Sequence, residues 1–286
     1  MTQTTETQIT ETQTAETQTT ETQATEAYQA TQYLLRRIIP PHLYYKLRTF
    51  NRQYPLLFLP FARWRWRKWR AKYCADITGV EPAAPQPLEK ESQIVIEAYP
   101  RSGNTFAHVA FKYAQQTPVP IAHHTHAAAN LIAGVRQKKP ALVIIREPED
   151  AVVSYLIGDF DPHLSMEQAL REYISFYQPL VKYKSQLVVA TFAELISDYG
   201  TVIERVNLKF KTNFSAFEHT QENVECCFEL IDRGYEQTFG ELSEKVVSRP
   251  AASRQTMKEQ LLQEFNSDRL KELVTRAKNT YTELVD

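Results

Sequence analysis

The sequence predicts an α/β fold, a parallel sheet covered by helices on both faces. Three short apolar runs rich in Val and Ile are the expected strands: Gln93–Ala98, Ala141–Ile145 and Gln186–Thr191. Helical stretches alternate with them, and this alternation favours parallel strands. A chain of 286 residues with 43% hydrophobic content can bury one sizeable core.

The first 32 residues are expected to form a disordered tail. Residues 5–26 repeat a five-residue unit of the type Thr-Glu-Thr-Gln-x and contain almost no apolar side chain. A period of five fits neither a helix face nor a strand, and this composition cannot offset the entropy lost on ordering. The tail also lacks the basic start and the apolar stretch of a signal peptide.

Residues 33–91 form a second unit, a basic segment followed by a proline-rich linker. Between Tyr33 and Tyr73 there are eleven Lys or Arg and no Asp or Glu, and residues 64–69 hold all three tryptophans. No run reaches the length of a membrane-spanning helix. Interleaved Trp and Arg suit the headgroup layer of an anionic membrane. Two alternatives stay open: the segment packs on the folded domain, or it binds an acidic polymer.

The third unit, residues 92–286, is the globular domain. Its first strand leads into a polar turn before a helix expected over Phe106–Ala114, and the turn reads Tyr99-Pro100-Arg101-Ser102-Gly103-Asn104-Thr105-Phe106. Free N–H groups at a helix N-terminus favour an anion, and Arg101 adds a fixed positive charge. The turn therefore predicts a phosphate or sulfate cradle. It is not the nucleotide-hydrolase P-loop, because GxxxxGK[ST] is absent.

A second polar motif follows the strand at Ala141–Ile145. Arg146 comes directly after the strand, Pro148 suits the first turn of a helix, and Ser154 lies about two turns further on. Arg146 and Ser154 can then meet on one phosphate, while Asp150 supports the helix start. Further helices are predicted over Met166–Lys184, Thr201–Lys211, Asn223–Asp232, Arg254–Phe265 and Asp268–Leu284.

Four of the seven histidines lie within nineteen residues: His108, His123, His124 and His126. Such a cluster first suggests a metal site. No HExxH motif and no nearby pattern of Cys or carboxylates accompanies it, so we expect no metal.

Together these motifs resemble those of the sulfotransferases that use 3′-phosphoadenosine 5′-phosphosulfate (PAPS). The family's turn reads Tyr-Pro-Lys-Ser-Gly-Thr-Thr-Trp, and its second motif has Arg, Pro, Asp and Ser at the spacing found here. The resemblance implies a P-loop-like sulfotransferase fold and PAPS as co-substrate, without a metal. It assigns the phosphosulfate and adenine to Arg101, Ser102, Gly103, Asn104, Thr105 and Phe106, and the 3′-phosphate to Arg146 and Ser154.

The catalytic assignments also come from this resemblance. The family's Lys-Thr-His segment aligns with His124-Thr125-His126, which makes His126 the general base on the acceptor. His124 then stands where the family has the Lys that, with Arg101, carries charge on the sulfuryl group. His124 and, after it, His123 stay open as alternative bases.

Two places depart from the family pattern. Phe192 stands where the family has a Tyr at the nucleotide site, so a hydroxyl is lost. The late Arg-Lys-Gly motif is absent, and Arg249 and Arg254 in that region are either nucleotide ligands or surface charges.

The expected activity is sulfuryl transfer from PAPS to a hydroxyl, less readily an amine, of a small molecule, lipid or glycan, with no nucleic acid partner. Two alternatives remain: a non-catalytic membrane-associated protein on a degenerate nucleotide fold, and a nucleotide kinase. The three cysteines suggest no disulfide framework. A cytoplasmic protein with peripheral membrane contact is therefore expected.

Overall fold

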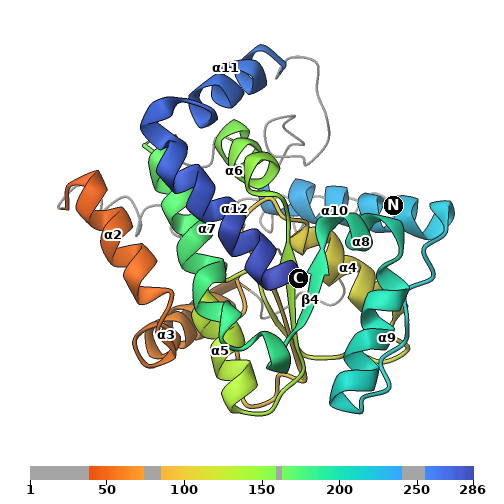
Figure 1. Ribbon diagram of the computed structural model, residues 1–286. Helices are drawn as coiled ribbons and strands as arrows, with labels where there is room; N and C mark the ends of the chain where they lie inside the picture. Colours follow the sequence, from red (N-terminus) through yellow and green to blue (C-terminus); the bar gives the residue numbers. More distant parts are fainter. Residues whose placement is uncertain (1–38, 74–84, 159–162, 240–254) are drawn as a thin grey trace, which may run out of the picture.

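The computed structural model describes residues 39–73, 85–158, 163–239 and 255–286 (Figure 1). A parallel four-stranded sheet lies at its centre, with the strand order β2-β1-β3-β4. The strands are β1 (Ile94–Ala98), β2 (Ile121–His123), β3 (Ala141–Ile145) and β4 (Val188–Thr191). The predicted α/β class is thus confirmed. The expected tail lies outside the described residues, as does the linker up to residue 84.

The strands match the apolar runs of the sequence because both faces of the sheet are covered. All five residues of β1 and all five of β3 are buried. The sequence prediction missed β2, which has only three residues and begins the histidine-rich segment. It adds to the free edge of β1, where Ile96 pairs with His123.

Two hydrophobic cores lie on opposite faces of the sheet (Figure 1). Ile96 and Ile144 point to one face, which is covered by α4 (Asn104–Ala114), α8 (Phe192–Ser197), α9 (Tyr199–Phe210) and α10 (Gln221–Phe239). Val95 and Val143 point to the other face. It is covered by α5 (Ala128–Arg136), α6 (Pro148–Ile157), α7 (Met166–Val181), α11 (Gln255–Phe265) and α12 (Lys271–Val285).

The helix starts follow local capping chemistry. Ser165 accepts from the Gln168 N–H at the start of α7, and Asp198 accepts from the Thr201 N–H at the start of α9. Thr191 and Glu194 form a reciprocal capping box on α8. Pro148 occupies the first turn of α6, as predicted, so the end of β3 passes directly into that helix.

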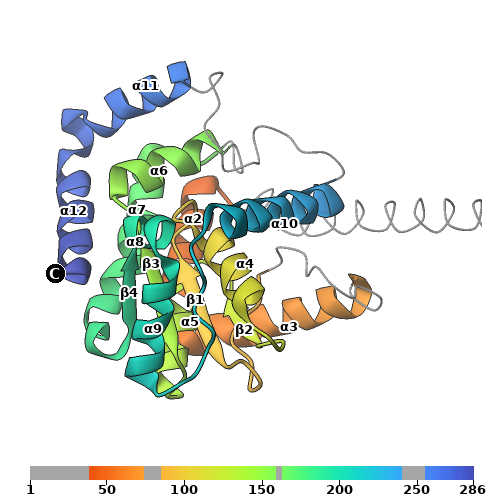
Figure 2. The same ribbon diagram turned by 90° about the vertical axis from the view of Figure 1, so that its right-hand side faces the viewer.

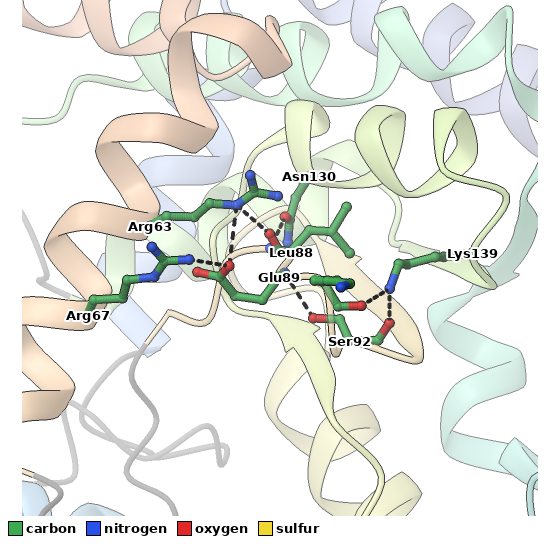
Figure 3. A network of polar contacts seen from close by, with 8 residues as sticks. Arg63, Arg67, Leu88, Glu89, Ser92, Asn130 and Lys139 are labelled. Carbon is green, nitrogen blue, oxygen red and sulfur yellow. Dashed lines mark hydrogen bonds and ion pairs between the residues drawn. The ribbon is translucent and has the colours of Figure 1, made fainter.

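The basic segment folds as two helices, α2 (Pro41–Asn51) and α3 (Pro55–Tyr73). Figure 3 shows how α3 is attached: Arg63 Nε donates to Leu88 O at 2.7 Å, and Arg67 pairs with Glu89 at 2.9 Å. Leu59 is buried on the same helix. The inner face of α3 therefore packs on the folded domain, which was one of the alternatives for this segment. The C-terminal end of α3 projects away from the sheet (Figure 2).

The outer faces of α2 and α3 carry apolar side chains at helical spacing. Leu43, Leu47, Phe50 and Tyr54 form one exposed row, and Leu57, Phe61 and Trp64 form another. We call the two rows together the outer apolar face. Membrane binding by this face stays a prediction. Among the described helices, none combines the length and the apolar character that a bilayer crossing requires.

Candidate functional site

The first strand ends in a tight turn that opens onto the N-terminus of α4. Arg101 and Gly103 have φ angles of 63° and 92°, and the Ser102 N–H closes the turn on Tyr99 O at 3.2 Å. The N–H groups of the first turn of α4 have no intrahelical acceptor, and no side chain caps them. A Cβ on Gly103 would lie 2.5 Å from Leu195, so this position requires glycine both for its φ and for space.

The second motif contacts this turn, whereas the predicted meeting of Arg146 and Ser154 on one phosphate stays a prediction. Arg101 Nε donates to Ser154 Oγ at 3.3 Å, and Arg146 Nη1 donates to Arg101 O at 3.1 Å. Asp150 lies 3.9 Å from the Arg146 guanidinium, a distant pair on an exposed carboxylate. Burial lowers the pKa of Arg146, while Asp150 raises it. The Arg146 Nε is buried and lacks a hydrogen-bond partner among the described residues, so its N–H group is available to donate to a ligand.

Two aromatic residues border the turn. Phe192 at the start of α8 lies beside Gly103, and its ring centroid is 4.3 Å from the Arg146 guanidinium carbon. Phe106 packs against the rings of Phe217, His219 and Phe228, with the nearest centroid 5.6 Å away. Arg249 and Arg254, the remaining predicted nucleotide ligands, lie outside the described residues.

The histidine-rich segment turns back beside the same helix start. His124 and His126 have φ angles of 55° and 48°, and with Arg101 they are three of the five non-glycine residues of positive φ in the described ranges. Strained backbone of this kind gathers at functional sites. His124 Nε2 lies 3.2 Å from Thr105 Oγ1, which joins this segment to the predicted cradle.

The His126 ring has a defined tautomer. Its Nδ1 lies 2.7 Å from Ala98 O, and because a carbonyl only accepts, Nδ1 must carry the proton. Burial lowers the pKa of His126 to about 4, an effect that the bond to Ala98 partly opposes. At neutral pH the ring is therefore neutral, and its Nε2 carries a lone pair. This is the form of imidazole that can accept a proton.

His126 borders a small open pocket between α2 and α7. The other lining residues are Thr49, Arg52, Tyr99, Pro100, Ala128, Glu172, Ser175 and Phe176. Arg48 forms a short ion pair with Glu172 at its edge. The spacing along the chain gave no sign of this pocket, because α2 and α7 are more than 100 residues apart in the sequence.

The sequence analysis also missed Glu97, a fully buried acid on β1. Its Oε1 accepts from the Thr125 N–H at 2.9 Å, the Thr125 hydroxyl at 2.5 Å and the Asn130 amide at 2.9 Å. Its Oε2 accepts from the His126 N–H at 3.1 Å. Glu97 thus holds the strained turn that carries His126. In the sequence, the position of Glu97 is marked by an acidic residue within an otherwise apolar strand.

The Glu97 network extends to α3. Asn130, which donates to Glu97, also accepts from the Leu88 N–H at 2.7 Å, and Leu88 O binds Arg63 (Figure 3). Burial raises the pKa of Glu97 to about 7, while the hydrogen bonds from Thr125, Asn130 and His126 lower it. Glu97 is therefore partly protonated at neutral pH in the folded chain.

Glu97→Gln should remove a pH dependence of stability. The folded chain keeps a proton on Glu97 that the unfolded chain has lost above an ordinary pKa of 4.5, so this carboxyl makes stability fall as the pH rises from 4.5 to 7. Between pH 5 and pH 8 the wild type should lose about 2–3 kcal/mol of unfolding free energy relative to Glu97→Gln. Urea unfolding at both pH values measures the difference.

Glu91→Gln, at an exposed carboxyl of the segment that precedes β1, is the matched control. Its pH dependence should follow that of the wild type. Parallel curves for wild type and Glu97→Gln would show that Glu97 titrates at an ordinary pKa.

Comparison with solved structures gives structural neighbours of this chain. No family model matches the chain, and no curated protein matches it. The crystal structure of mouse sulfotransferase SULT7A1 complexed with PAP is similar over 67% of this chain and 90% of that chain. The two share 12% sequence identity, with a TM-score of 0.39. A likeness of this degree carries no conclusion about the activity of this chain.

Proposed function

We propose that this protein transfers a sulfuryl group from PAPS to an acceptor hydroxyl. The observation that carries the proposal is the 3.3 Å contact between Arg101 Nε and Ser154 Oγ. It joins the turn at the start of α4 to α6, and Arg146 also donates to Arg101 O, so the residues proposed for the phosphosulfate and for the 3′-phosphate lie next to one another. A 5′-phosphosulfate and a 3′-phosphate on one nucleoside require two such sets of residues.

The nucleotide would be held by charge and by backbone dipoles. Arg101 and the N–H groups from Gly103 to Phe106 bind the phosphosulfate at the helix N-terminus. Arg146 and Ser154 bind the 3′-phosphate, and Phe106 offers a ring face to the adenine. Phe192 replaces a hydroxyl contact by a ring against Arg146. Arg249 and Arg254 are proposed to contribute from the region after α10.

The chemistry would use His126 as general base. Its Nε2 accepts the proton of the acceptor hydroxyl while that oxygen forms a bond to sulfur. The bond between sulfur and the bridging phosphate oxygen breaks, and 3′-phosphoadenosine 5′-phosphate (PAP) leaves with the electron pair. Arg101 and the α4 N-terminus stabilise charge on the leaving oxygen. His124, in contact with Thr105, is proposed to orient the cradle.

The acceptor would enter through the pocket between α2 and α7, where His126 forms part of the wall. Arg52 and Glu172 give this wall both signs of charge, which suits a polar hydroxyl compound such as a glycan or a lipid headgroup. We further propose a cytoplasmic enzyme that contacts anionic membrane through the outer apolar face.

Titration of the purified full chain with PAP, 5′-AMP and Mg-ATP tests the proposal. PAP should bind at least tenfold more tightly than 5′-AMP, because a charge-assisted contact to the 3′-phosphate contributes about 1.5–3 kcal/mol. Radiolabelled PAPS with a panel of hydroxyl compounds should then yield labelled product. Tight Mg-ATP binding without PAP binding would favour a kinase instead. PAP binding without turnover on any acceptor would favour the non-catalytic alternative.

A further inference from the structure

Three imidazoles meet in the core behind the predicted cradle. His108 comes from α4, His123 ends β2, and His124 begins the strained turn. The rings of His108 and His123 have centroids 3.7 Å apart, and the Nδ1 atoms of His123 and His124 are 2.6 Å apart. One nitrogen from each ring can be chosen so that all three lie within 4.8 Å of one another. All three residues are buried.

The cluster leaves a buried polar atom unsatisfied. His108 Nε2 has no hydrogen-bond partner among the described residues, and a buried polar atom without a partner is costly. His124 Nε2 is by contrast engaged with Thr105 Oγ1. Burial lowers the pKa of all three histidines well below the ordinary value, so each ring is neutral and retains one lone pair. Neutral imidazole is the ligand form for a transition metal.

We propose that His108, His123 and His124 bind one divalent transition metal ion of the zinc class. His108 would contribute Nε2, and His123 and His124 would contribute Nδ1. Zn–N bonds of about 2.0–2.1 Å place tetrahedral ligand nitrogens about 3.3 Å apart. The rings of His108 and His123 are stacked with an interplanar angle of 25°, so metal binding requires these two rings to rotate apart. A water molecule completes the coordination.

The contacts around the cluster suit such a site. With Nδ1 on the metal, His124 carries its proton on Nε2 and donates it to Thr105 Oγ1, an outer interaction typical of metal-bound histidine. The Asn104 amide, oriented to satisfy both neighbours, accepts from the His124 N–H at 3.2 Å and donates to Ile96 O at 3.3 Å. The ion would therefore fasten α4 to the end of β2 and fix the turn that carries His126.

The histidine cluster in the sequence suggested a metal site, but that interpretation was set aside because the ligands form no local motif. His108 lies 15 positions before His123 and on a different element. The proposal replaces the expectation of a metal-free protein. One of its ligands, His124, also contacts Thr105 of the predicted cradle, so Zn²⁺ affinity is measured separately from PAP affinity and the two proposals can fail independently.

Metal titration of the tag-free full chain tests the site directly. After treatment with EDTA and dialysis, calorimetry with Zn²⁺ should give one ion per chain with a dissociation constant of about 1 μM or tighter. Co²⁺ should give the strong visible absorption of a four-coordinate ion with nitrogen and oxygen ligands. A wild-type chain that binds no stoichiometric Zn²⁺ would overturn the proposal. A thiolate-to-cobalt charge-transfer band would also overturn it, since it would place the ion on one of the three cysteines.

Variants assign the ligands. His108→Phe keeps an aromatic ring against His123 but lacks the nitrogen, and His108→Gln is the second variant if the first does not fold. Zn²⁺ affinity should fall by about 100-fold or more, since loss of an outer-shell partner alone costs 10–100-fold. His42→Ala, at an exposed histidine of α2, should bind as the wild type does. Unchanged binding by a folded His108 variant would contradict the assignment, whatever the affinity for PAP.

Discussion

His126→Ala is expected to abolish measurable sulfuryl transfer while PAP affinity stays nearly unchanged. His126 lies in the wall of the proposed acceptor pocket, and its Nε2 carries a lone pair. The hydrogen bond from Nδ1 to Ala98 O holds the ring in the tautomer with the proton on Nδ1. General-base assistance contributes about 10²–10⁴-fold, so turnover should fall by that factor. Release of PAP from PAPS at saturating acceptor measures turnover, and calorimetry measures PAP binding.

His42→Ala removes a histidine from the exposed surface of α2 and should transfer at the wild-type rate. His124→Ala should impair catalysis through the loss of the Thr105 contact. If His124→Ala is inactive and His126→Ala transfers normally, the alignment of the histidine segment is displaced by two residues. If His126→Ala loses PAP affinity to the same degree as turnover, His126 supports the nucleotide and not the acceptor.

Arg146→Ala should weaken PAP binding by about 10- to 100-fold and leave 5′-AMP binding almost unchanged. The guanidinium is proposed to bind the 3′-phosphate, and a charge-assisted hydrogen bond contributes about 1.5–3 kcal/mol. Because Arg146 also donates to Arg101 O, a small loss of 5′-AMP affinity is expected from the relaxed turn. Parallel calorimetric titrations of the two nucleotides separate the effects.

Arg136→Ala is the matched control, because it removes an exposed arginine from the end of α5, outside the predicted cradle. Its affinity for both nucleotides should equal that of the wild type. An Arg146→Ala variant that loses the same factor for PAP and for 5′-AMP would mean that Arg146 acts on the 5′ end or on the turn itself.

The sequence predicted those strands and turns that are specified by residues close together in the chain. β1 and β3 are short runs of β-branched residues buried on both faces, so the strands were predicted almost to the residue. The polar turns follow these strands directly, so both motifs were expected at the carboxyl ends of the strands; the contact of 3.3 Å between Arg101 and Ser154 was not predicted. β2 was missed because three residues at the edge of a sheet leave no periodic pattern.

The remainder of the site depends on contacts between distant segments. Glu97 was ignored because its partners, Thr125 and Asn130, lie about thirty positions away. The acceptor pocket joins Thr49 to Glu172, which no spacing rule connects. The basic segment was ambiguous for a related reason: its composition is the same whether Arg63 faces a lipid or binds Leu88 O.

The proposed nucleotide site and the proposed acceptor pocket between α2 and α7 use different segments of the chain. The predicted nucleotide ligands that the structure describes lie between Arg101 and Phe192, whereas one wall of the pocket, with Thr49 and Arg52, comes from a helix more than forty residues earlier. Substitutions in that helix can therefore alter which acceptor is admitted without disturbing the cradle. Related proteins that share the cradle could diverge in substrate by exchanging this early helix, and chimaeras joined near Tyr54 are a practical route to new acceptors.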